Sequence, residues 1–139
     1  MNYRKSVLAI IFNESNEFLM IREGKDFGFV QGGIEENETE EDAVNRELKE
    51  ELNLTNFKII RKCNYKNKYD YPKEIQEKTS ILGQEQTIFL IRYLETNQIK
   101  KEEGISKIKW FKEKEVFDKL PYENLKLAFR KAMDEIKLN

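Results

Sequence analysis

Apolar residues form short blocks in the first part of the chain, and their spacing predicts strands. The segments Ser6–Phe12 and Phe18–Ile21 are almost wholly apolar and are separated by a polar stretch, which indicates a hairpin of two buried strands. Residues Asp26–Val30 alternate and predict a further short strand. Gly32 and Gly33 are then expected to interrupt the strand pattern, and an acidic stretch follows.

The next periodic segment predicts a helix over residues 40–52. Thr39 followed by Asp42 matches a capping box, in which each side chain accepts a hydrogen bond from the backbone of the other residue. Val44, Leu48 and Leu52 recur every four residues and give the helix one apolar stripe that faces the core.

The second half of the chain continues with strand-like and helix-like patterns. Phe57–Asn64 predicts a strand, Gln86–Leu94 predicts a central strand covered on both faces, and Ile105–Trp110 predicts another short strand. Tyr65–Gly83 is polar, aromatic and irregular, and we interpret it as a surface loop. Apolar residues from Leu125 to Ile136 trace a helical stripe. Together these elements predict one α+β domain over residues 1–139, with helices packed on a mixed sheet.

Composition narrows the possible chemistry. The 25 lysines and arginines balance 26 aspartates and glutamates, and a net charge of −1 lacks the basic excess of a protein that coats nucleic acid. The absence of histidine excludes histidine-dependent catalytic triads and histidine-ligated zinc. The single cysteine, Cys63, cannot close an internal disulfide and is expected to be a small strand residue. Neither a signal peptide nor a membrane-spanning stretch is apparent, so the sequence predicts a cytoplasmic protein without a membrane partner.

One acidic cluster requires a counterion. Residues 35–51 contain nine acidic side chains against two basic ones, which gives a local charge of −7. In a helix, Glu47, Glu50 and Glu51 lie on one side, where like charges repel each other. A bound divalent cation removes that repulsion, and carboxylate oxygens are the ligands that Mg²⁺ and Mn²⁺ prefer. The spacing therefore predicts a Mg²⁺ site that Mn²⁺ can also occupy.

The same segment resembles the Nudix box, whose pattern is G-x5-E-x7-R-E-U-x-E-E-x-G-U, with U aliphatic. Seven positions match at the proper separations: Gly32, Glu38, Arg46, Glu47, Leu48, Glu50 and Glu51. Asn37 and Asn53 replace two glycines that are usual in the family. Asparagine adopts a positive φ more readily than most residues, so both positions are expected to be left-handed.

The resemblance implies a Nudix fold, an α/β/α sandwich whose central mixed sheet carries helices on both faces. The metal ligands that it implies are Glu47, Glu50, Glu51 and a carbonyl of Gly32 or Gly33. One of the three carboxylates would orient or deprotonate a water, and Arg46 and Glu38 would brace the loop. Hydrolysis of a phosphoanhydride requires charge neutralisation and a water held in line, and both tasks suit a cation with carboxylates.

Relatives in this family often carry a further carboxylate six residues before a late tryptophan. Six residues before Trp110 is Gly104, and a shift of one residue in the loop would bring in Glu103. Glu103 is therefore a candidate catalytic residue, with a solvated loop charge as the alternative. Glu85 is a weaker candidate for the same role.

Shorter motifs resemble the branch of the family that contains dinucleoside polyphosphate hydrolases and bacterial-type RNA 5′-pyrophosphohydrolases. They are Tyr3-Arg4, Gln31-Gly32-Gly33-Ile34, Tyr69-Asp70-Tyr71-Pro72 and Gly83-Gln84-Glu85-Gln86. Tyrosines and lysines interleave over residues 62–73, which suits a nucleobase and its phosphates, although an ordinary polar loop fits the same pattern. The expected substrate-binding residues are Arg4, Arg22, Tyr69, Tyr71, Lys73 and Gln86.

The resemblance favours a Mg²⁺-dependent pyrophosphohydrolase that acts on a nucleoside-linked polyphosphate. Its first implied substrate is diadenosine tetraphosphate, split asymmetrically to a nucleoside triphosphate and a nucleoside monophosphate. The alternative is an enzyme that trims the 5′-triphosphate end of RNA, followed by a house-cleaning nucleoside triphosphate hydrolase. A Nudix fold used only as a binding module is least favoured, because such a module has little reason to crowd Glu47, Glu50 and Glu51.

Overall fold

The computed structural model describes residues 1–94 and 99–137, and the strands of these residues form one seven-stranded sheet. The strands are β1 (Asn2–Phe12), β2 (Glu17–Glu23), β3 (Asp26–Gly28), β4 (Val30–Gly33), β5 (Phe57–Asp70), β6 (Ile81–Tyr93) and β7 (Lys107–Lys112). The sheet order is β3-β2-β1-β6-β5, with β4 also paired to β1 and β7 to β2. Strands β1 and β6 run parallel and the other pairs run antiparallel, so the sheet is mixed, as predicted.

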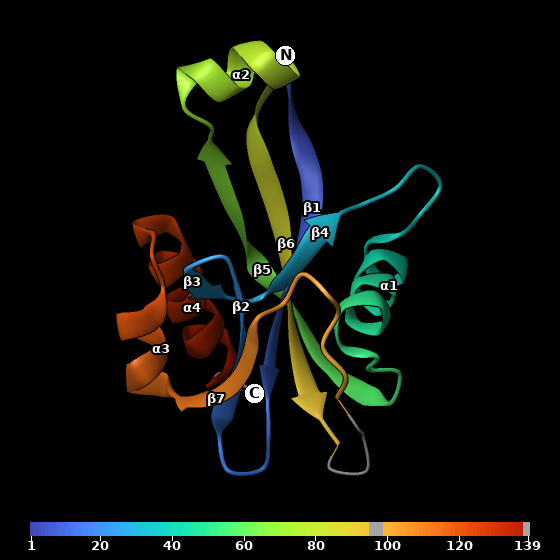
Figure 1. The fold of residues 1–139 in the computed structure, drawn as a ribbon, viewed down its shortest axis with the longest axis vertical. Coiled ribbons are helices and arrows are strands. Elements are labelled where there is room, and N and C mark those ends of the chain that lie inside the picture. Colours follow the sequence, from blue (N-terminus) through green and yellow to red (C-terminus); the bar gives the residue numbers. More distant parts are fainter. Residues whose placement is uncertain (95–98, 138–139) are drawn as a thin grey trace.

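The helices of the described residues are α1 (Glu40–Leu52), α2 (Lys73–Thr79), α3 (Glu113–Lys119) and α4 (Glu123–Ile136). Figure 1 shows α1 on one side of the sheet, α3 and α4 on the other, and α2 at the end of the sheet where the N-terminus lies. This arrangement confirms the expected α/β/α sandwich. None of the helices in the described ranges is long and apolar enough to cross a membrane.

Alternation along the strands divides the core into two layers. In β1, Leu8 and Ile10 pack on the side of α4, whereas Val7 and Ala9 pack on the side of α1. The four residues Ile88–Ile91 of β6 are fully buried, which confirms the prediction of a central strand covered on both faces.

The N-terminal hairpin forms as predicted between β1 and β2. The predicted strand Asp26–Val30 divides into β3 and β4, because the chain changes its pairing partner from β2 to β1 around Phe29. The prediction that Gly32 and Gly33 interrupt the strand pattern is wrong, since both lie inside β4 and pair with β1.

The prediction of an irregular loop over Tyr65–Gly83 is also wrong. The chain continues in β5 as far as Asp70, then forms α2 and enters β6. Within this part of β5, Asn67 is buried and Tyr69 half-buried, while the residues that flank them are exposed. Such alternation is typical of a strand with one solvated face, and the lack of aliphatic residues concealed it. Cys63 is a buried residue of β5, as expected.

Candidate active site

Helix α1 sets the direction of the clustered carboxylates. The Thr39 hydroxyl accepts a hydrogen bond from the Asp42 amide at 3.0 Å, and the Asp42 carboxylate accepts one from the Thr39 amide at 3.1 Å. This capping box, predicted from the sequence, fixes the start of the helix. Because the apolar stripe of α1 packs against the sheet, Glu47 and Glu51 lie at the border between the core and solvent.

The two asparagines that replace family glycines both adopt positive φ angles, 67° at Asn37 and 55° at Asn53. The Asn53 amide donates to the Lys49 carbonyl at 2.9 Å and ends α1 in the left-handed conformation. Both expectations are confirmed, and the loops on either side of α1 keep the backbone shape that glycine would give.

Arg46 ties α1 to the loop that precedes it. Its Nε and Nη2 donate to the two Glu38 oxygens at 2.7 and 3.0 Å, and Nη2 also donates to the Gly33 carbonyl at 2.8 Å. Its Nη1 donates to Glu47 Oε1 at 2.8 Å. The Arg46 side chain holds the pKa of Glu38 below its usual value. One guanidinium therefore positions both the loop and a candidate metal ligand.

Two glycines of β4 allow side chains to approach the backbone closely. A Cβ atom on Gly32 would overlap the Glu47 carboxylate, and a Cβ atom on Gly33 would overlap the Arg4 guanidinium. The need for glycine at these positions is steric, because both lie in ordinary extended strand.

The position of Glu51 is unfavourable for a charged carboxylate. Burial raises the pKa of its carboxyl to about 8. The carboxylates of Glu23, Glu47 and Glu102 act in the same direction. Its Oε2 is buried and has no hydrogen-bond partner among the described residues. A buried anionic oxygen without a donor is destabilising, so this position favours a cationic ligand.

The carboxylates of α1 fit a divalent cation. No three of them already converge at metal-ligand spacing in the part of the chain that the structure describes. Glu50 is mostly exposed and its Oε2 lies 3.4 Å from Arg46 Nη1, while Glu47 contacts the same guanidinium. Glu47, Glu50 and Glu51 would have to reorient to hold an ion together, and the unpartnered oxygen of Glu51 would then gain the charge partner that it lacks.

The charges of two further carboxylates, Glu23 and Glu102, raise the pKa of Glu51, and no local sequence pattern predicted either of them. Glu23 ends β2, and the Glu102 amide donates to the Glu51 carbonyl at 3.0 Å. Glu102 and the expected contributor, Glu103, are both exposed, and Glu102 is the loop carboxylate whose charge raises the pKa of Glu51. The weaker candidate, Glu85, forms an ion pair of 2.7 Å with a lysine of β1, which lowers its pKa.

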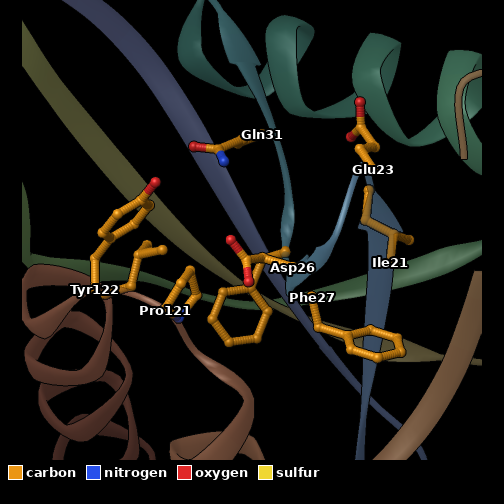
Figure 2. A pocket seen from close by; sticks show the side chains of 10 residues that line it. Ile21, Glu23, Asp26, Phe27, Gln31, Pro121 and Tyr122 are labelled. Carbon is orange, nitrogen blue, oxygen red and sulfur yellow. The ribbon is translucent and has the colours of Figure 1, made fainter.

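Two adjoining cavities connect this region with the tyrosines. The smaller, of about 220 Å³, is lined in part by Glu23 and Gln31. The larger, of about 440 Å³, is lined in part by Gln31, Tyr69, Tyr71 and Tyr122. Figure 2 shows Glu23 reaching toward α1, while Gln31 and Tyr122 lie at the other end of the smaller cavity. No sequence signal links Tyr122 to this place, because it comes from the segment between α3 and α4.

A chain of amides orients Gln31. Asn67 Nδ2 donates to Gln86 Oε1 at 2.8 Å, and Gln86 Nε2 donates to Gln31 Oε1 at 2.7 Å. Since the oxygen of Gln31 is engaged, its Nε2 remains as a donor at the cavity wall. Gln86, an expected substrate-binding residue, is itself 0% exposed and acts on the cavity only through Gln31.

The other expected substrate-binding residues divide into two groups. Tyr69 and Tyr71 pack edge to face with ring centroids 6.0 Å apart. Burial raises the pKa of Tyr69, and the nearby charge of Arg4 opposes this shift, so Arg4 belongs to the same region. Arg22 instead hydrogen-bonds to the loop before β7, and Lys73 is exposed at the start of α2. The structure therefore does not bring Arg22 and Lys73 to the tyrosine-lined cavity.

Comparisons with known proteins agree with this geometry. The sequence matches the family model described as NUDIX domain over residues 2–133. An RNA pyrophosphohydrolase of Sulfurovum sp. (strain NBC37-1) is 35% identical over 147 residues, which cover 96% of this chain and 92% of that protein. An RNA pyrophosphohydrolase of Helicobacter pylori is 38% identical over 106 residues, which cover 70% of this chain and 68% of that protein.

Solved structures share the fold at lower identity. The Escherichia coli dihydroneopterin triphosphate pyrophosphohydrolase has a TM-score of 0.77 at 18% identity, covering 93% of this chain and 95% of that one. An Ap4A hydrolase of Caenorhabditis elegans has a TM-score of 0.76 at 17% identity, covering 96% and 99%. With the family match across nearly the whole chain, the protein belongs to the Nudix hydrolases and is a pyrophosphohydrolase of that family.

Proposed function

We propose that this protein is a Mg²⁺-dependent RNA pyrophosphohydrolase that removes pyrophosphate from the 5′-triphosphate end of RNA. The observation that carries the proposal is the buried, unpartnered oxygen of Glu51, which feels the charge of Glu23, a residue that lines the smaller of two adjoining cavities, while tyrosines line the larger one. This arrangement offers one place for a cation on the phosphates and another for a nucleobase. The curated relatives, which are named RNA pyrophosphohydrolases and match over most of the chain, support the RNA end as substrate.

The side chains of the site divide the work of hydrolysis. Glu47, Glu50 and Glu51 would hold Mg²⁺, or Mn²⁺ in its place, and the ion supplies charge neutralisation on the phosphoanhydride and an activated water. Arg46, which is bonded to Glu47, would hold that carboxylate in place for the cation. A carboxyl whose pKa is about 8, as at Glu51, holds a proton at neutral pH and releases it when a cation binds. With a cation bound, Glu51 would be deprotonated, and its carboxylate would be able to accept or direct the proton of the attacking water.

The tyrosine-lined cavity would receive the first nucleobase of the RNA. Tyr69, Tyr71 and Tyr122 offer aromatic faces, and Gln31 offers a fixed amide donor. Stacking on aromatic rings tolerates any base, which suits an enzyme that meets many RNA sequences. Arg4, which lies close to Tyr69, adds a positive charge at this end of the site.

Diadenosine tetraphosphate is the second candidate substrate. The observation in its favour is the size of the tyrosine-lined cavity, about 440 Å³, with three aromatic side chains in its wall. A dinucleoside polyphosphate presents a second base, which such a wall can stack. The sequence motifs alone favour diadenosine tetraphosphate. The relatives named RNA pyrophosphohydrolases favour the RNA end, and we therefore rank the RNA end first.

A direct comparison of substrates tests the proposal. Pyrophosphate release from 5′-triphosphorylated RNA and nucleotide release from diadenosine tetraphosphate and from ATP would be measured with Mg²⁺ and with EDTA. We expect kcat/KM to be highest for the RNA, with no turnover in EDTA and a kcat/KM about a hundredfold to a thousandfold lower in the Glu51→Gln variant. A preference for diadenosine tetraphosphate would establish the second candidate, and a preference for ATP would contradict both.

A further inference from the structure

On the face of the sheet that carries α3, three cationic side chains lie against two aromatic rings, and a fourth pairs across the strands with one of them. Arg22 of β2 lies directly opposite Lys107 of β7, and Lys109 follows two residues along β7, so all three point to the same face. Lys119, at the end of α3, completes the group. We call Arg22, Lys107, Lys109 and Lys119 the β7 basic cluster; Figure 1 shows β7 beside α3.

Two aromatic rings hold the cluster together. The Nζ atoms of Lys109 and Lys119 lie 5.2 and 5.7 Å from the centre of the Phe111 ring. The Arg22 Cζ lies 5.7 Å from the centre of the Phe27 ring. The two rings touch edge to face with centroids 5.1 Å apart. Cation–π contacts therefore keep several positive charges close together on one small surface.

No carboxylate of the described residues lies within ion-pair distance of the cluster. None of its four side chains forms an ion pair with another described residue. Lysines on the opposite face of the sheet differ, since Lys5 pairs with Glu85 and Lys62 pairs with Glu40, each at 2.7 Å. Two ammonium groups over one ring repel each other, and an anion placed between them would relieve this repulsion.

The cluster adjoins the candidate active site. Glu23 follows Arg22 in β2 and points to the opposite face of the sheet, so the connection runs through Phe27, which contacts Arg22 and lines the same cavity as Glu23. Arg22 Nε also donates to Ser106 Oγ at 3.2 Å, and this residue lies in the loop that carries Glu102. A polymer whose 5′ end occupies the site can therefore leave the smaller cavity past Phe27 and meet the cluster.

We propose that the β7 basic cluster binds the phosphate backbone of the RNA downstream of its 5′ end, an inference that rests on the proposed function. Lys107 and Lys109 are two residues apart on β7, which separates them by about 7 Å along the strand. The cluster can therefore contact more than one phosphate. Such a surface offsets the repulsion between RNA and the acidic residues of α1. The ring beneath the lysines, Phe111, is only 2% exposed, so the surface offers charge rather than an apolar wedge for a membrane.

The test removes charge without touching the site. In the triple variant Lys107→Gln, Lys109→Gln and Lys119→Gln, three positive charges are lost and side-chain length is largely kept. The dissociation constant would be measured by fluorescence anisotropy for a single-stranded RNA of about 20 nucleotides that carries a 5′-hydroxyl, across a series of salt concentrations. We expect binding to weaken at least about tenfold at low salt, and the slope of log Kd against log salt to fall by about two, because three phosphate contacts are lost.

The matched control removes three exposed lysines from other elements: Lys58→Gln, Lys78→Gln and Lys131→Gln. It changes the net charge equally, and we expect RNA binding close to that of the unmodified protein. Equal weakening in the two triple variants, or no measurable RNA binding by the unmodified protein, would overturn the inference. Charge-dependent binding to anionic lipid vesicles in the absence of RNA binding would also overturn it.

Failure of the proposed function has a separate signature. The 5′-hydroxyl RNA has no phosphoanhydride, so its binding does not depend on catalysis. If the protein binds this RNA through the cluster but does not hydrolyse 5′-triphosphorylated RNA, the inference about the cluster is supported and the substrate assignment is wrong. If it hydrolyses the RNA and the two triple variants bind RNA equally well, the substrate assignment is supported and the inference about the cluster is wrong. Turnover of diadenosine tetraphosphate, which has no polymer to bind, should stay unchanged in both triple variants.

Discussion

The two ends of the candidate site are built in different ways. At the α1 end, contacts join residues close in sequence, as in the bonds of Arg46 to Glu38 and Glu47. At the tyrosine end, the cavity wall takes residues from β4, β5 and the start of α4, and the amide chain spans Gln31 to Gln86. The α1 end also holds an excess of negative charge, whereas hydrogen bonds satisfy the amides of the tyrosine end.

This difference suggests that the α1 end serves the chemical step and the tyrosine end serves substrate recognition. A helix with a capping box and a brace can hold carboxylates wherever it packs, so the charge pattern of α1 is a local property. The tyrosine-lined cavity exists only when the pairings of the sheet are correct, because distant strands contribute to it. Changes at the α1 end should therefore abolish turnover, and changes at the tyrosine end should alter the choice of substrate.

The largest effect is expected from Glu51→Gln. The variant removes one ligand charge and keeps the side-chain volume, so we expect kcat/KM to fall about a hundredfold to a thousandfold, as when one electrostatic stabiliser of a transition state is lost. The fold should persist, because the substitution removes a buried oxygen that has no partner among the described residues. Steady-state kinetics and a thermal melt would measure both. Glu36→Gln, at an exposed position just before α1, is the control and should keep full activity; full Mg²⁺-dependent turnover by Glu51→Gln would contradict the assignment of this end.

The second expected effect links metal, pH and stability. The folded-state pKa of Glu51 is raised from 4.5 to about 8, so the native protein binds this proton more tightly than the unfolded chain. Without metal, the stabilisation that comes from the protonated Glu51 carboxyl is complete below about pH 4.5 and is lost as the pH rises through about 8. Mg²⁺ at a hundred times its Kd should restore about 2.7 kcal/mol at high pH.

Thermal melts over this pH range, with Mg²⁺ and with EDTA, would measure the effect. Glu51→Gln should remove most of both the pH dependence and the response to Mg²⁺. Identical melting curves with and without saturating Mg²⁺ at pH 8 would argue against a cation site on α1.

Local signals explain why the α1 end was predictable. The capping box, the apolar stripe and the positive φ values of Asn37 and Asn53 all follow from residue types within one segment, and the structure confirms them. Glu23 and Glu102 were not predictable in this way, since they reach Glu51 only through β2 and the loop before β7.

The second half of β5 shows the opposite case. Its alternation was present in the sequence, but the inward positions hold one asparagine and two tyrosines rather than aliphatic residues, so a hydrophobic pattern could not reveal it. Asn67 is buried because Gln86 of the neighbouring strand accepts its hydrogen bond. Such a partner is known only once the strands are paired.

A smaller effect is expected from Gly32→Ala. Its new Cβ would overlap the Glu47 carboxylate, so we expect the side chain of Glu47 to move, with a loss of about 2 kcal/mol in stability and about tenfold in kcat/KM. Gly28→Ala is the matched control, because a Cβ at that position meets nothing within 4 Å. Denaturant titration and kinetics of the two variants would measure the difference. If both variants behave like the unmodified protein, the close approach of β4 to Glu47 is unimportant for activity.

The smallest effect, and the one that tests the tyrosine end alone, is expected from Tyr69→Ala. If Tyr69 stacks on a nucleobase, its loss should weaken productive binding by about 1 kcal/mol, the lower end of the range for base stacking, because Tyr71 and Tyr122 remain in the cavity wall. KM should rise while kcat and Mg²⁺ dependence stay the same, since the α1 end is untouched. The loss should be greater for diadenosine tetraphosphate, which presents a second base, than for ATP. Tyr69→Phe keeps the ring and serves as the control. Equal kinetics for Tyr69→Ala and Tyr69→Phe on every substrate would remove Tyr69 from recognition and leave substrate choice to Gln31 and the remaining tyrosines.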